Sequence, residues 1–227
     1  MHSRAMIVMG IALAAFAGPK PAAELDGVLD RINKAGASFK GMSAHLHRVE
    51  HVAAINEDNV DSGTILLKRA HARDMRMLVD FTQPDPKTVA LQGQKGEIYY
   101  PKMETVQEYD LGKNRALLDE FFLIGFGTSR GDLQASYNLR LVGSDTVGGQ
   151  KTECLELIPK SKEVLQHLRK LEIWVAENGY PVQQKFYEVG GDYMIFTYSD
   201  VKINPELADS ALKLHLPKNV KREYPQK

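Results

Sequence analysis

The chain has 227 residues, of which 43% are hydrophobic and 26% charged, a composition typical of a globular protein with a sizeable core. Lysine plus arginine and aspartate plus glutamate balance at 29 each, so no net positive field attracts nucleic acid. No motif that combines basic and aromatic residues offers a stacking platform for bases either. Composition therefore excludes the disordered, collagen-like and nucleic-acid-binding classes.

The amino terminus has the pattern of an export signal. Arg4 supplies a positive start, residues 5–17 are almost wholly apolar, and Ala15-Phe16-Ala17 is a small-x-small cleavage site. This run of about 13 residues is shorter than the roughly 20 that cross a membrane, so an N-terminal anchor is the weaker alternative. We expect residues 1–17 to be a signal peptide and residues 18–227 to form one soluble periplasmic domain. No cysteine near the cleavage site indicates a lipid anchor of its own.

The chain contains one cysteine, Cys154, which alternates with glutamates in the segment 152–157. A single cysteine cannot form an internal disulfide, even in an oxidising compartment. The pattern favours a small buried hydrophobe in a strand over a nucleophile.

The first half of the chain predicts one helix and then strands. Apolar residues spaced for one helix face predict a helix over residues 23–39, which Gly36 and Gly41 end. Residues 42–52 and 62–69 have the character of long strands. In the segment 75–81 the odd positions are all apolar and two of the three even positions are charged, the period of a strand with one buried face. Three more short strands follow, at residues 88–91, 97–100 and 105–111.

The second half predicts a buried helix followed by more strands. Residues 113–126 are apolar on nearly all sides, so this helix must be buried on several sides or cover something apolar. Further strands are expected at 137–147, 151–158, 168–176, 182–189 and 193–201, with a closing segment at 212–216. The total of about eleven strands and two or three helices, without a linker, indicates a single antiparallel α+β domain.

Residues 127–131 match the G-x-S-x-G pattern of hydrolases, with Ser129 as the nucleophile. That pattern requires a preceding strand, whereas here the predicted apolar helix precedes it, so a helix-ending loop is favoured. The spacing of Gly125, Gly127 and Gly131 also differs by one residue from a dinucleotide fingerprint. No pair of carboxylates stands out, and we expect neither catalytic residues nor a cofactor.

Three histidines, His45, His47 and His51, share one face of the strand predicted at 42–52. Imidazoles on one face are candidate metal ligands. A strand separates positions two apart by about 7 Å and positions six apart by about 20 Å, so at most two of the three could bind one ion. A solvated strand face is favoured, and no metal is expected.

The apolar strand faces are the most informative feature. Ile65 and Leu67 lie on the face that also carries Arg69, and Met75, Met77, Val79 and Phe81 form the buried face of the next strand. Later strands add Phe186, Trp174, Tyr193 and Tyr187. An ordinary filled core and a cavity for flexible alkyl chains remain open alternatives, and methionines suit the second.

Four motifs, in this order and after a signal peptide, resemble the LolA-like family of periplasmic outer-membrane lipoprotein carriers, over a stretch from about Leu25 to the carboxyl terminus. The motifs are Gly63-x4-Lys68-Arg69, Phe81-Thr82-Gln83-Pro84-Asp85, Gly96-x2-Tyr99-Tyr100-x-Pro101 and Leu214-x-Leu216-Pro217-x2-Val220.

The resemblance implies an incomplete antiparallel β-barrel whose concave face is covered by lid helices and encloses an apolar cavity for acyl chains. It places Arg69 as a latch that bonds the closed lid. The residues expected to line the cavity are Ile65, Leu67, Met75, Met77, Val79, Phe81, Leu117, Leu118, Phe121, Phe122 and Ile124.

The function implied is non-enzymatic: a monomeric carrier of acylated lipoproteins or other lipid cargo, working between an inner-membrane release transporter and an outer-membrane acceptor. The alternative is an envelope-stress sensor or lipid-sensing interaction module built on the same half-barrel. Relatives of the sensor type usually carry an additional domain, so the end of this chain straight after the last expected strand favours the carrier.

Overall fold

The computed structural model describes residues 21–71, 74–112 and 124–226, and within them twelve strands form one sheet. The first six are β1 (Gly41–Val52), β2 (Glu57–His71), β3 (Asp74–Gln83), β4 (Lys87–Gln92), β5 (Lys95–Tyr100) and β6 (Thr105–Asp110). The other six are β7 (Tyr137–Val147), β8 (Gln150–Pro159), β9 (Leu168–Ala176), β10 (Pro181–Glu188), β11 (Tyr193–Ile203) and β12 (Lys221–Glu223). The eleven strands expected before residue 204 are therefore all present.

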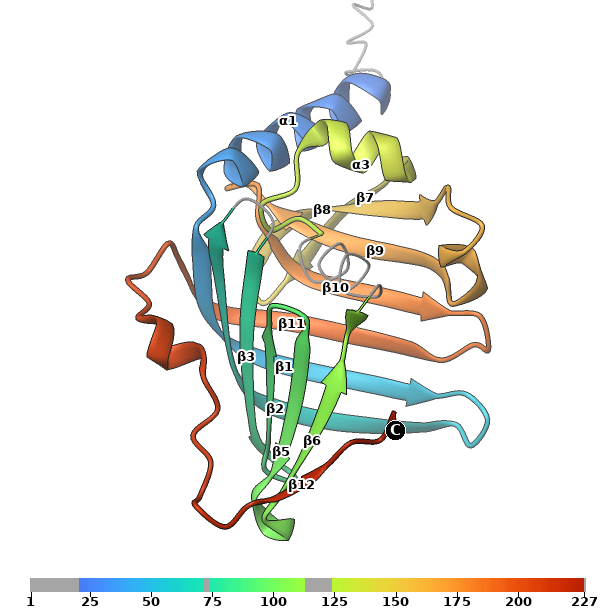
Figure 1. Ribbon diagram of the computed structural model, residues 1–227. Coiled ribbons are helices and arrows are strands. Elements are labelled where there is room, and N and C mark those ends of the chain that lie inside the picture. Colours follow the sequence, from blue (N-terminus) through green and yellow to red (C-terminus); the bar gives the residue numbers. More distant parts are fainter. Residues whose placement is uncertain (1–20, 72–73, 113–123, 227) are drawn as a thin grey trace, which may run out of the picture.

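The sheet is open, with the order β12-β6-β5-β4-β3-β2-β1-β11-β10-β9-β8-β7. All neighbours are antiparallel except β12, which pairs with β6 in parallel. The sheet curls so that β3 to β6 rise at a steep angle to β7 to β11, and the helices α1 (Pro21–Ser38) and α3 (Arg130–Ser136) lie beside each other next to β7 and β8 (Figure 1). The fold is thus an incomplete antiparallel barrel with helices, of the α+β class, as predicted.

Helix α1 packs on the inner face of the later strands. It begins with a proline, whose missing N–H costs nothing in the first helical turn. Its apolar face, Val28, Leu29 and Ile32, is at most 1% exposed and packs in one cluster with Leu155 and Leu171. The helix predicted at 23–39 is confirmed, and it covers one part of the concave face.

Strand β3 shows the predicted alternation. Met75, Met77, Val79 and Phe81 are 4–5% exposed, and each carries its side chain to the inner face of the sheet. The register with β2 places residues 65 and 67 opposite residues 79 and 77, so the apolar positions of the two strands form one continuous inner surface. This surface is one wall of the concavity.

The predicted helix at 113–126 lies mostly outside the described residues. Its last three residues, 124–126, form a turn rather than a helix. Of the loop expected at 127–131, residues 127–129 form a turn and loop, whereas residues 130 and 131 begin α3, with Ser129 as its N-cap. The helix that this loop was expected to end lies mostly outside the described residues.

The closing strand expected at 212–216 was also wrong. A short 3₁₀ helix, η4 (Asp209–Leu212), ends there, and the Gln92 side-chain amide donates to the Leu212 carbonyl. The backbone N–H of Lys213 donates to Ser210, so these groups are not available to a sheet ladder. The last strand forms later, as β12. Among the described residues, no helix is long and apolar enough to cross a membrane.

Candidate functional site

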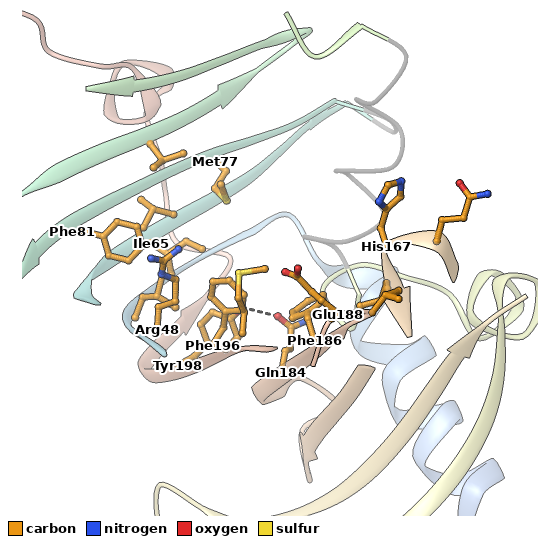
Figure 2. Close-up of a pocket in the computed structure, with 18 residues that line it drawn as sticks. Arg48, Ile65, Met77, Phe81, His167, Gln184, Phe186, Glu188, Phe196 and Tyr198 are labelled. Atoms are coloured by element: carbon orange, nitrogen blue, oxygen red, sulfur yellow. Dashed lines mark hydrogen bonds between the residues drawn. The ribbon is translucent and has the colours of Figure 1, made fainter. Parts of the chain in front are cut away.

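A pocket of about 590 Å³ lies in the concave face of the sheet. Strands β1 to β4 form one side, and β9 to β11 with the 3₁₀ helix η3 (Val164–Gln166) form the other (Figure 2). Its apolar lining consists of Leu46, Ile65, Met77, Val79, Phe81, Val89, Leu168, Phe186, Val189, Met194, Phe196 and Tyr198. The polar side chains in the wall are Arg48, Gln166, His167, Gln184 and Glu188. A concave, mostly apolar wall with few polar groups is typical of a small-molecule site.

Four residues of the predicted cavity line this pocket: Ile65, Met77, Val79 and Phe81. Leu67 and Met75 do not line it, although they belong to the same buried cluster as these four residues, together with Phe39 and Phe126. Ile124 belongs to the cluster beneath α1 and is 1% exposed. The remaining four, Leu117, Leu118, Phe121 and Phe122, lie outside the described residues.

Sequence reasoning missed much of the opposite wall. Phe186 and Phe196 pack edge to face there, with ring centroids 5.7 Å apart. Alternation along β10, where the side chains of Val182, Gln184 and Phe186 point inward, was the signal available for part of this wall. The inner positions of β11 give a weaker signal, because this strand is apolar on both faces.

Three aromatic residues grouped with Phe186 from the sequence point to the other face. Tyr187 alternates with Phe186 along β10, and its hydroxyl donates to Glu172 at 2.7 Å. Trp174 donates through Nε1 to Asp145, and Tyr193 stacks on the His51 ring at 4.6 Å. These residues are not in the pocket wall.

A group of ion pairs lies beside two residues of the pocket lining, Arg48 and Phe81. Asp61, 5% exposed, accepts hydrogen bonds from Arg48 Nε at 2.9 Å and from Lys87 Nζ at 3.0 Å. Both cations lie over the Phe81 ring, at 5.5 and 5.1 Å from its centroid. Because a buried carboxylate is costly without partners, the two cations account for the presence of the buried Asp61 beside the pocket.

A buried chain of hydrogen bonds crosses the pocket wall at Gln184, which is 2% exposed. Its Nε2 donates to the Ile124 carbonyl at 2.6 Å, and its Oε1 accepts from the Tyr198 hydroxyl at 2.7 Å (Figure 2 draws the second bond). Burial raises the pKa of Tyr198, so its hydroxyl stays protonated and donates. The Gln184 amide nitrogen, the Gln184 amide oxygen and the Tyr198 hydroxyl therefore each have a hydrogen-bond partner.

Arg69 bonds the segment that Ile124 begins. We call residues 124–129 the strap. Arg69 Nη2 donates to the Gly127 carbonyl at 2.6 Å, and its guanidinium lies 5.8 Å from the centre of the Phe39 ring. Phe126, between the two bonded carbonyls, is completely buried and meets Tyr198 edge to face at 5.3 Å. The strap is therefore fastened to the concave face at two carbonyls and one ring.

Ser129 has a structural role in the part of the chain described. Its hydroxyl accepts from the backbone N–H of Asp132 at 3.1 Å, and the Asp132 carboxylate accepts from the backbone N–H of Ser129 at 3.2 Å. This reciprocal pair is a capping box, which satisfies two N–H groups at the start of α3. The spacing Ser129-x-x-Asp132 was a sequence signal for a helix start.

The three histidines of β1 have separate partners. His45 contacts Asp200 at 3.0 Å, His47 contacts Ser62 at 3.2 Å and His51 contacts Asp58 at 2.7 Å. Within the ranges 21–71, 74–112 and 124–226, no group of three or more His, Cys, Asp or Glu could hold a metal ion.

Cys154 is buried, as its strand pattern indicated. Burial is the main cause that raises the pKa of its thiol to about 12. The thiol is therefore protonated at neutral pH, and a protonated thiol is a poor nucleophile.

Fold and pocket together define a class of protein: an incomplete antiparallel barrel that holds an apolar pocket in its concave face. Residues 39–215 match the family described as outer membrane lipoprotein carrier protein LolA. The chain belongs to the LolA family. No curated protein matches the sequence.

Solved structures share the fold at low sequence identity. An uncharacterised conserved protein from Thermus thermophilus is 15% identical with a TM-score of 0.52, over 90% of this chain and 99% of that one. The lipoprotein LppX from Mycobacterium tuberculosis is 14% identical with a TM-score of 0.50, over 83% and 99%. MucB is 16% identical with a TM-score of 0.51, over 85% of this chain but 63% of MucB. This chain thus spans less than two thirds of MucB, and these likenesses show the fold alone.

Proposed function

We propose that the protein is a periplasmic carrier that binds the acyl chains of lipoproteins, or of another lipid, and ferries them from the inner to the outer membrane without covalent chemistry. Residues 1–17 direct export in this proposal. The partners are an inner-membrane release transporter and an outer-membrane acceptor, and the carrier acts as a monomer.

The observation that carries this proposal is the pocket in a chain of the LolA family. Twelve apolar side chains line its wall, and Met77 and Met194 adapt to chains of varied shape. Arg48 and Lys87 are both paired with Asp61 beside Phe81, and the wall between Met77 and Phe186 is left for alkyl chains.

Release must accompany tight binding. Each buried methylene contributes about 0.8 kcal/mol, so an acyl chain would leave slowly unless part of that energy is spent on a conformational change. We assign Arg69 as the latch for this change, because its bond to the Gly127 carbonyl fastens the strap beside the pocket. Loading then costs the free energy of breaking this bond.

The first test is binding of a fluorescent fatty acid, cis-parinaric acid, followed by fluorescence titration. Met77 is 4% exposed and lines the pocket, so Met77→Gln places an amide against the alkyl chain without a partner. A polar group buried without a hydrogen bond costs about 1–3 kcal/mol, so we expect roughly tenfold weaker binding.

Met103 offers the matched control, since it is 61% exposed on the 3₁₀ helix η1 (Pro101–Met103). Met103→Gln makes the same chemical change away from the pocket and should leave binding unaltered. Circular dichroism verifies that both variants are folded. Failure of the wild-type protein to bind the probe, or equal binding by both variants, would contradict the assignment of the pocket.

The sensor alternative uses the same pocket, so binding alone does not separate the two functions. An assay of lipid transfer to a membrane does separate them. A carrier loaded with a labelled lipid releases it to an acceptor preparation of outer membranes, whereas a sensor retains it and changes its affinity for a protein partner.

A further inference from the structure

Gln184 is a buried side chain that belongs to the pocket wall and also bonds the strap. It lines the pocket, and it bonds the strap through the Ile124 carbonyl at 2.6 Å. A carbonyl can only accept, so the amide nitrogen faces the strap and the amide oxygen faces Tyr198. A leucine would fill the same space in this apolar wall, so packing alone does not call for an amide here.

Tyr198 joins the same unit from the neighbouring strand. Its ring lines the pocket and meets Phe126 of the strap edge to face, while its hydroxyl donates to Gln184. A ligand in the pocket would therefore contact Gln184 and Tyr198, the two lining side chains that also contact the strap. Arg69, by contrast, bonds the strap from outside the pocket wall.

Glycines allow the strap to approach this closely. Gly125 has φ +82°, and a Cβ there would come within 2.8 Å of the Pro181 ring at the start of β10. Gln184 lies three positions after Pro181, so β10 supplies both the surface on which the strap packs and the amide that bonds it. The strap thus contacts β10 at two neighbouring places, Gly125 at Pro181 and Ile124 at Gln184.

We infer that Gln184, oriented by Tyr198, is a positioning residue that fastens the strap to the pocket wall, and that acyl ligands enter and leave when this fastening is released. The inference rests on the proposed lipid-binding function and adds a second fastening, inside the pocket, to the one at Arg69. Entry and exit then share one barrier, so loss of the amide speeds both.

The test compares association and dissociation rates of cis-parinaric acid by stopped-flow fluorescence. Gln184→Leu keeps an apolar side chain of similar size but cannot bond Ile124. We expect both rates to rise about fivefold, the ratio that corresponds to about 1 kcal/mol for one lost hydrogen bond. Gln183→Leu makes the same change on the opposite face of β10, where Gln183 accepts from Thr197, and should leave both rates at wild-type values.

Gln184→Glu adds a pH dependence of the rates, which a change in packing alone would not produce. At about pH 5 the buried carboxyl is neutral, donates to Ile124 and accepts from Tyr198, so the rates should equal those of the wild type. At about pH 9 it is ionised and cannot donate, so the rates should match those of Gln184→Leu. The other titratable groups in the pocket wall, Arg48, His167 and Glu188, are common to all the proteins, so rate ratios to wild type isolate position 184.

Hydrogen exchange tests the fastening without a ligand. We expect the peptide that spans residues 124–129 to exchange faster in Gln184→Leu than in the wild type or Gln183→Leu. Normal probe binding with equal rates in all four proteins, and unchanged exchange of the strap, would overturn this inference alone. Failure of the wild type to bind the probe would overturn the proposed function, and the gating role with it.

Discussion

At position 127, only glycine fits between Arg69 and Phe39. The backbone φ is +83°, a left-handed conformation, and an added Cβ would overlap Arg69 Nη2 and lie 3.1 Å from the Phe39 ring. A larger residue would displace the guanidinium from the carbonyl that it bonds. The glycine is therefore a condition for the Arg69 contact.

We expect Gly127→Ala to lower the free energy of unfolding by at least about 1 kcal/mol more than Gly148→Ala, because overpacking adds roughly 1–3 kcal/mol. Gly148 also has positive φ, +56°, but nothing lies within 4 Å of its added Cβ, so it reports backbone strain alone. Urea unfolding measures both. Equal losses in the two variants would show that the space beside Arg69 is not tightly filled.

Residue-level partners were the least predictable feature of the site. The resemblance placed Arg69 as a latch, but the carbonyl that it bonds lies 58 residues along the chain, and no local pattern specifies that carbonyl. Gln184 gave no signal, because a single amide in an alternating strand does not reveal what it bonds. Ser129 was different, since its partner is three residues away and the capping box is readable from the sequence.

At the scale of elements, the outer face of the later strands carries a ladder of ion pairs. Glu156 on β8 accepts from Lys170 on β9 at 2.9 Å and pairs with Arg140 on β7 at 2.9 Å. The hydrogen bond from Lys170 is the main cause that holds the pKa of the Glu156 carboxyl below its usual value, and the bond from Arg140 adds to it. The ladder thus joins three strands next to the open edge of the sheet.

This lowered pKa sets the sign of a pH effect. A carboxyl with a lower pKa in the folded state stabilises the fold above its unfolded pKa of about 4.3, and the stabilisation is lost as the pH falls through the folded pKa. We expect Glu156→Gln to be less stable than wild type at pH about 7, with the difference disappearing in acid. Chemical unfolding at several pH values measures this, with exposed Glu163→Gln as control. A constant difference at every pH would contradict the ion-pair account.

Strand positions were predictable and strand environments were not. Alternation located β1 to β11 and identified the buried face of β3, because a period of two directly reports which side chains share a face. It could not separate Met77, which lines the pocket, from Met75, which does not, because both are buried in the same cluster. That distinction depends on the curvature of the sheet.

At the scale of the whole molecule, the curvature of the open sheet produces the pocket. Strands β1 to β4 and β9 to β11 are far apart in sequence, yet their inner faces line one cavity (Figure 2). The C-terminal segment crosses to the other side of the sheet, where Lys68 pairs with Asp209 at 2.6 Å and Leu212 is fully buried. The motif around Leu214 and Pro217 therefore belongs to a crossing segment, and the strand follows at β12.

The class of fold was predictable because family motifs and strand periodicity agree on it. The pattern of apolar residues is the same for a filled core and for a cavity. Ile65, Met77, Val79 and Phe81 line the pocket and also belong to a buried apolar cluster, so the binding experiment with Met77→Gln decides between the two.

Native mass spectrometry of the protein purified from its own cells under non-denaturing conditions tests most directly whether the pocket holds an acyl lipid. We expect a monomer with an added mass that organic extraction removes and that lipid analysis identifies as an acylated molecule. Met77→Gln should retain less of it, and Met103→Gln as much as the wild type. A protein of bare polypeptide mass that takes up no lipid on incubation would contradict the carrier account.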